Sequence, residues 1–375
     1  MDLTPEDALR LNVLLANPLK AVRIDESRMT LHALSEKGEA KIQLNPNCRD
    51  ESYLRRVRET LSSHALGSPG GYPVYLKRWT RMGQARDGIL ESLLLLGEPE
   101  AVIALVNAAG ITDELASRAW WASQTSENAR CMLRQQLVLE GRMGPVLAEF
   151  LVEFLPFEEE ARDQIRSVRL VLQGQLIDGE QRMKLWERGR HKNAFYVGFL
   201  QAVPDALPGE SGANPAWENT SERLADLHAA GNPFAVQLCR LLSATGQNYL
   251  AGVEAVLKKP ANQDVMVELM HALAGHAEVL PLERPRLETT SAIHRQVEGL
   301  LEAAGEEQAP ELTALLQALP GAVHHIRAML FLALLDEPVL DPVLSRTDAI
   351  GTVMRKKLMT VTVPVQEQID ILKDK

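Results

Sequence analysis

The sequence has few cysteines and no long apolar run, and both shortages exclude classes of protein. Cys48, Cys131 and Cys239 are widely spaced and odd in number, so they form neither a disulfide framework nor a paired-cysteine redox or zinc motif. The most apolar stretch, 329–335, is far shorter than the roughly 20 residues that span a bilayer. We expect no membrane span and cysteines that are small buried side chains. A redox or sulfur-carrying role for Cys131 or Cys239 stays open.

The sequence also lacks the common signatures of catalysis. It contains no P-loop, no Rossmann glycine fingerprint, no HExxH motif and no nucleophile elbow. His324 and His325 are adjacent, so on a helix they diverge by about 100° and need help from other segments to face one metal. We therefore predict no catalytic residue, no metal site and no cofactor. An enzyme with an unrecognised site stays an open alternative.

The balance of charge is acidic, with a formal net charge of −10 at pH 7. Such a protein is repelled as a whole by nucleic-acid backbones and by anionic membranes, so a contact with either needs a local basic patch. Residues 1–7 are acidic and lack the positive and apolar regions of a secretory signal. These features predict a folded protein of the cytoplasm that does not associate with membranes.

The pattern of apolar residues predicts a mainly α protein with a small antiparallel β meander near the N-terminus. Thr4 and Pro5 are typical of a helix start. Three short alternating runs then follow, at 22–24, 29–33 and 40–44, and the turn 35–38 fits a hairpin with a positive φ angle at its glycine.

From residue 50 onward, apolar residues recur at helical spacing and are interrupted by glycine, proline or an N-cap. Short helices joined by short turns predict an irregular α-solenoid-like stack, although no fixed repeat period is visible. One late strand is predicted at 360–363 from its alternation of threonine and valine. Helices are predicted at 89–96, 101–108, 113–122, 143–155, 159–172, 181–188, 193–203, 233–242 and 249–257.

The predicted organisation has four parts, divided mainly by a stretch rich in glycine and proline. Residues 209–216 are rich in residues that interrupt regular structure and poor in residues that pack, so they are predicted to be a linker. The other parts are a small α+β region (1–66), a helical domain (67–208) and a second helical domain (217–375).

The most unusual segment joins a glycine-rich turn to aromatic residues interleaved with positive charge. Between residues 49 and 87 there are eight basic and four acidic side chains, inside an acidic protein. Backbone amides in the turn and nearby guanidinium groups suit an anionic ligand, or RNA if the aromatic rings stack on bases. A solvated helix face followed by a structural turn is the alternative. The candidate ligand- or partner-binding residues are Arg55, Arg58, Tyr72, Tyr75, Lys77, Arg78, Trp79 and Arg81.

Several stretches of the first half of the chain resemble the DsrS family, accessory proteins encoded beside dissimilatory sulfite reductase in sulfur-oxidising bacteria. The resemblance implies a cytoplasmic protein that acts in or around the reverse sulfite reductase pathway, and it implies no catalytic or cofactor residues. The stretches are MDLTPEDALRLNVLLAN (1–17), NPNCRDESYLRRVRE (45–59), GSPGGYPVYLKRWTRMGQ (67–84), LVEFLPFEEE (151–160) and KNAFYVGFLQAVPDALP (192–208).

Taken together, these features favour a non-catalytic interaction or regulatory scaffold of sulfur oxidation. The expected partners are proteins, with sulfite reductase or sulfur-transfer components as candidates from the resemblance. A binder of a small anionic ligand or of RNA through residues 49–86 is the alternative, and nucleic acid is the weaker form of it because the chain is acidic.

Overall fold

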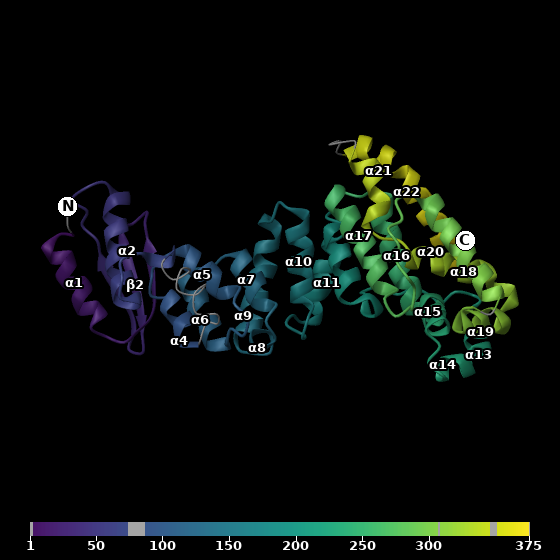
Figure 1. Ribbon diagram of the computed structural model, residues 1–375, viewed down its shortest axis with the longest axis horizontal. Helices are drawn as coiled ribbons and strands as arrows, with labels where there is room; N and C mark the ends of the chain where they lie inside the picture. Colours follow the sequence, from purple (N-terminus) through teal and green to yellow (C-terminus); the bar gives the residue numbers. More distant parts are fainter. Residues whose placement is uncertain (1–2, 74–86, 307, 346–350, 375) are drawn as a thin grey trace. The chain divides into compact units, whose positions relative to one another are not determined.

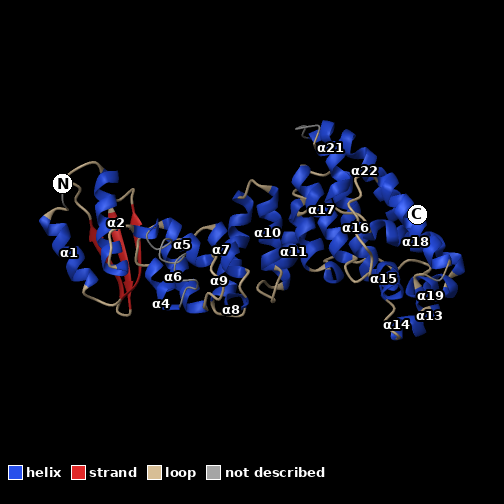
Figure 2. Cartoon of the chain, viewed as in Figure 1, coloured by secondary structure: helices blue, strands red, loops and turns tan. Residues whose placement is uncertain are grey.

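The computed structural model describes residues 3–73, 87–306, 308–345 and 351–374, and it confirms the mainly α prediction (Figure 1). The chain divides into two compact units, Met1–Phe154 and Leu155–Lys375. Figure 2 shows three strands, in red, close to the N-terminus and helices through the rest of the described residues. Each unit has its own apolar core and is described by itself.

The predicted meander is present in the first unit. Strands β1 (Leu19–Asp25), β2 (Thr30–Ser35) and β3 (Gly38–Gln43) pair antiparallel in that order. The hairpin between β2 and β3 closes at Ser35 and Gly38, and Gly38 has a φ angle of 111°, as its position in the turn requires.

One face of this sheet, helix α1 (Pro5–Leu15) and helix α2 (Asp50–Leu66) enclose the N-terminal core. The alternation of side chains along each strand brings apolar residues of neighbouring strands to the same face. Thr4 caps α1 by accepting a hydrogen bond from the Asp7 amide at 3.3 Å, as the sequence predicts. The core residues include Leu11, Leu15, Val22, Leu31, Ile42, Tyr53, Val57 and Leu61.

Short helices make up the rest of the first unit, and consecutive helices pack on one another. Helices α6 and α7 open with the threonine caps Thr112 and Thr125, which accept hydrogen bonds from the amides three residues on. These helices are α4 (Asp87–Leu93), α5 (Pro99–Val106), α6 (Asp113–Ala122), α7 (Ser126–Leu133), α8 (Gln136–Leu139) and α9 (Met143–Phe154).

The described residues of the second unit form helices and loops and no strand, and α12 lies at the centre of its packing. This helix contacts α10, α16 and α17, and a Cβ added at Gly198 would lie 2.7 Å from Val168, so the glycine permits a close helix approach. The elements are η1 (Leu155–Phe157), α10 (Ala161–Val171), α11 (Gly179–Arg188), α12 (Ala194–Ala202), η2 (Pro204–Ala206), α13 (Trp217–Arg223), α14 (Ala225–Ala229), α15 (Pro233–Leu242), α16 (Ala244–Lys258), α17 (Gln263–His276), α18 (Thr290–Gly305), α19 (Pro310–Ala318), η3 (Pro320–Ala322), α20 (Val323–Ala333), η4 (Glu337–Leu340), α21 (Asp341–Leu344) and α22 (Gly351–Leu372).

The prediction of a late strand at 360–363 is wrong, because these residues lie inside α22. Its buried side chains recur every three or four residues, which is the helical period. The alternating threonines and valines had suggested a strand because a four-residue window cannot separate the two periods. The buried series is Met354, Leu358, Val361, Val365, Ile369 and Leu372.

The predicted linker, 209–216, lies within the second unit. Asn214 is buried there, and its backbone amide donates to the Leu242 carbonyl at 2.9 Å. Its side-chain amide donates to the Leu372 carbonyl at 3.0 Å. The stretch is irregular in backbone, but Asn214 attaches it to α15 and to the end of α22.

Candidate interaction surface

The structure describes three of the eight predicted site residues. Arg55 and Arg58 lie on α2, and Tyr72 lies just after the glycine-rich turn that follows this helix. The other five fall outside the described residues, and they are Tyr75, Lys77, Arg78, Trp79 and Arg81.

A cavity of about 550 Å³ lies beside the described part of this segment, and its charge is mixed. Arg55 and Arg58 line it together with the carboxylates of Glu51, Glu59 and Glu98. Arg58 also forms an ion pair with Glu26, so its charge is already compensated. Around the described residues, the cavity therefore has no excess of positive charge that would favour an anion.

The glycine-rich turn is stabilised by side chains of the protein itself. The buried hydroxyl of Ser62 donates to the Ser68 carbonyl and accepts from the Gly71 amide, each at 2.7 Å. The amide of Tyr72 donates to the Glu98 carboxylate at 3.1 Å. The Glu98 carboxylate therefore already accepts a hydrogen bond from one of the backbone amides that were predicted to bind an anionic ligand.

Cys131 and Cys239 are in surroundings that favour the neutral thiol. Burial raises the pKa of Cys131 against the opposing effect of Arg134, whose guanidinium lies 3.0 Å from the sulfur. Burial also raises the pKa of Cys239. Since the thiolate is the reactive form, both sites are poorly suited to sulfur transfer at neutral pH.

The second unit contains a cavity of about 690 Å³ whose wall includes a bidentate ion pair. Arg240 donates to both carboxylate oxygens of Asp205, at 2.7 and 2.6 Å, and to the His276 carbonyl at 2.9 Å. All three guanidinium nitrogens therefore have internal acceptors. The pair ties η2, α15 and α17 together, and sequence spacing gave no signal for it.

His276, beside this ion pair, is buried and remains neutral at physiological pH. Its ring stacks on Tyr249 at a centroid distance of 4.0 Å, and its Nδ1 lies 3.1 Å from the Gln237 amide. Burial, assisted by the charge of Arg240, lowers the pKa of His276 to about 3. An imidazole with this pKa does not exchange protons near pH 7, so its role is in packing.

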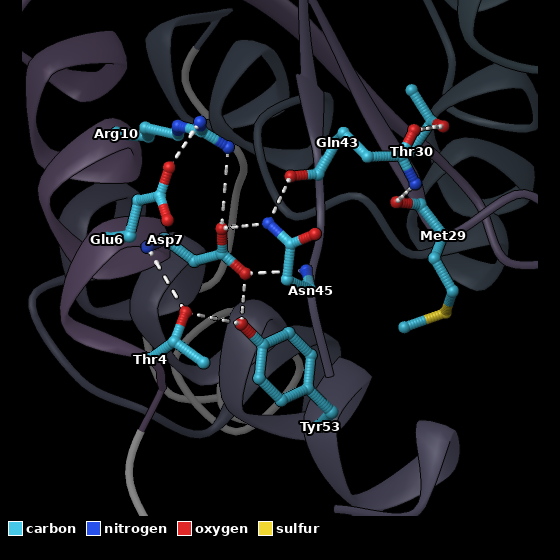
Figure 3. Close-up of polar contacts among 9 residues, drawn as sticks. All are labelled: Thr4, Glu6, Asp7, Arg10, Met29, Thr30, Gln43, Asn45 and Tyr53. Atoms are coloured by element: carbon cyan, nitrogen blue, oxygen red, sulfur yellow. Dashed lines mark hydrogen bonds and ion pairs between the residues drawn. The ribbon is translucent and has the colours of Figure 1, made fainter. Parts of the chain in front are cut away.

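A buried carboxylate organises the polar contacts of the first unit (Figure 3). Asp7 on α1 accepts hydrogen bonds from the Tyr53 hydroxyl and, at 2.7 and 3.2 Å, from the backbone and side-chain amides of Asn45. Burial alone would raise the pKa of Asp7, but these hydrogen bonds outweigh it and the pKa lies below its usual value. The cluster joins α1 to α2 and to the segment after β3.

The most distinctive surface among the described residues is the outer side of α22, which is both apolar and basic. Val353, Met359 and Val363 are 56%, 54% and 43% exposed, on the side opposite to the buried series. Large apolar side chains at this exposure on one helix are typical of protein-binding surfaces. We define the α22 face as Val353, Lys356, Lys357, Met359, Thr360 and Val363, all of which are exposed.

This surface is not predicted from the sequence, because residues 360–363 favour a strand. Two signals could have revealed it: the basic triplet 355–357 and the helical spacing of apolar residues from Met354 to Leu372. Among the described residues, no helix has the combination of length and apolar character that a bilayer crossing requires.

Comparison with known proteins adds no further assignment. No protein-family model, curated protein or solved structure matches the chain.

Proposed function

We propose that the chain is a non-catalytic interaction protein that docks a partner protein on the α22 face. The observation that carries the proposal is the exposure of Val353, Met359 and Val363 on one side of a helix whose other side is buried. Lys356 and Lys357 lie among them, so the matching partner surface is apolar and rimmed by carboxylates.

The energetic argument rests on the side chains that docking would cover. Fully burying a valine or methionine contributes about 1.5–3 kcal/mol, and these side chains are about half exposed, so docking gains roughly half of that from each. The helix is already ordered on the core, so little conformational entropy opposes binding. Lysines at the rim accelerate encounter with an acidic partner and confer salt dependence.

The proposed setting is dissimilatory sulfur oxidation in the cytoplasm, with sulfite reductase or sulfur-transfer proteins as partners. Support comes from the resemblance of the first half of the chain to the DsrS family. The raised pKa values of Cys131 and Cys239 support a role that does not carry sulfur.

The test measures binding of purified full-length protein to purified sulfite reductase and to sulfur-transfer proteins by biolayer interferometry. Met359→Glu with Val363→Glu places two carboxylates on the α22 face without touching the buried series. We expect this double variant to weaken binding by at least about 10-fold. A 10-fold loss of affinity corresponds to only about 1.4 kcal/mol of binding free energy.

The matched control is Leu9→Glu with Val13→Glu, which changes a second exposed apolar pair, one turn apart on α1. We expect the control to bind as the unmodified chain does. Equal affinity of the α22 variant and the unmodified chain would contradict the proposed surface.

A further inference from the structure

We propose that His324, His325 and Asp374 form a binding site for a transition-metal ion such as Zn²⁺. One ligand atom from each residue lies within 4.8 Å of those of the other two. Two imidazole nitrogens and one carboxylate oxygen are a donor set that zinc accepts, with a fourth position left for water or another ligand.

The two adjacent histidines lie on α20, and the third ligand, Asp374, comes from the segment that follows α22. Both lie in the first turn of α20, and their ring centroids are 4.0 Å apart. Asp374 follows the end of α22, which packs on α20 (Figure 1). Its Oδ1 lies 3.0 Å from Nε2 of His325. Donor atoms around tetrahedral zinc lie about 3.3 Å apart, so closing the site needs a movement of only about 1.5 Å.

The backbone that leads to Asp374 is anchored by polar contacts at the end of α22. The Leu372 carbonyl accepts hydrogen bonds from the side-chain amides of Asn214 and Gln247, at 3.0 and 2.9 Å. Lys373 reaches Glu254 at 2.8 Å, so the ammonium next to Asp374 is paired elsewhere. These anchors hold residues 372 and 373, directly before Asp374, and so lower the entropy cost of assembling the site.

Burial distinguishes the roles of the three ligands. His325 is 3% exposed, and its Nδ1 has no hydrogen-bond partner, which leaves its ring fixed mainly by packing and by Asp374. His324 and Asp374 are exposed and can rotate to complete the coordination. The nearby guanidinium of Arg327 is bonded to Glu298 at 2.7 Å, so its charge is compensated.

The experiment is isothermal titration of zinc chloride into the metal-free full-length chain. We expect saturable binding of one ion per chain, and loss of that binding in His324→Ala and in Asp374→Ala. Both changed residues are exposed, so the variants should keep the fold, which thermal unfolding without metal checks. The matched control is His191→Ala, which removes an exposed histidine between α11 and α12 and should bind zinc unchanged.

A second readout is the unfolding temperature with and without zinc. Binding to the folded chain alone should raise it for the unmodified protein and for His191→Ala, and leave it unchanged for the two ligand variants. Absence of saturable zinc binding, or equal binding by His324→Ala and the unmodified chain, would overturn the assignment. Neither result bears on the α22 face, because docking there does not require the metal.

Discussion

At the scale of single residues, the buried carboxylate of Asp7 connects parts of the chain that are far apart in sequence. The cap at Thr4 and the positive φ angle at Gly38 depend on neighbours within a few positions, and both were predicted. Asp7 looked like an ordinary acid in a first helical turn. Its partners Asn45 and Tyr53 are 38 and 46 positions away, so only the fold reveals that it is a buried acceptor.

Replacing Asp7 by asparagine should destabilise the first unit by about 1–3 kcal/mol, because at least one buried donor would lose its acceptor. The measurement is the urea concentration at which amides of residues 8–15 lose protection from hydrogen exchange. Glu6→Gln, an exposed change on the same helix turn, is the control and should have little effect.

The carboxylate of Asp7 also makes the stability of the first unit depend on pH in the acidic range. The folded pKa of Asp7 is lowered, so its contribution to stability is complete above the unfolded pKa of about 3.8 and is lost as pH falls through the folded value. The Asp7→Asn variant should lack this loss below about pH 4. An acid dependence equal to that of the unmodified chain would contradict this role.

His276 should give the second unit a pH dependence of a different origin. Between about pH 6.5 and pH 3 the unfolded chain binds a proton at this residue that the folded chain does not, so stability falls as pH falls. At about pH 4 the loss is about 3 kcal/mol. His276→Gln should remove most of it, as judged by urea midpoints for exchange of residues 263–276. Unchanged pH dependence in the variant would show that His276 is not the group responsible.

At the scale of secondary structure, elements with clear caps and spacing were predicted, whereas the longest described helix was not. The meander and helices such as α6 and α15 followed directly from spacing and caps. Helix α22 was misread locally because β-branched residues 360–363 favour strands, whereas its packing over 22 residues favours a helix. Packing decided the outcome, since each buried residue falls on one side of the helix.

The local stability of the C-terminal end of α22 should depend on Asn214, which connects this end to the irregular stretch 209–216. Asn214→Ala removes the hydrogen bond to the Leu372 carbonyl and the one accepted from the Ala216 amide. We expect faster hydrogen exchange at residues 365–372, measured by mass spectrometry. The control is Asn248→Ala, which removes similar bonds to the Leu207 and Gly209 carbonyls without contacting α22. Equal exchange at 365–372 in both variants would contradict the anchoring role.

At the scale of the whole molecule, the pattern of apolar residues was sufficient for the fold class but not for the site. The basic segment 49–86 drew attention as an excess of charge in the sequence, yet its described part is surrounded by Glu51, Glu59 and Glu98. The α22 face was hidden, because exposure depends on which side of a helix the core covers. Charge counted along the chain therefore did not predict charge available at the surface.

The most direct test of the central claim is a hydrogen-exchange footprint of the full-length chain, free and in complex with purified sulfite reductase or a sulfur-transfer protein. We expect new protection at residues 353–363, reduced when salt rises from about 50 mM to about 500 mM, since screening weakens the contribution of Lys356 and Lys357. Protection confined to residues 49–73, with 353–363 unchanged, would contradict the account and transfer the binding surface to the basic segment.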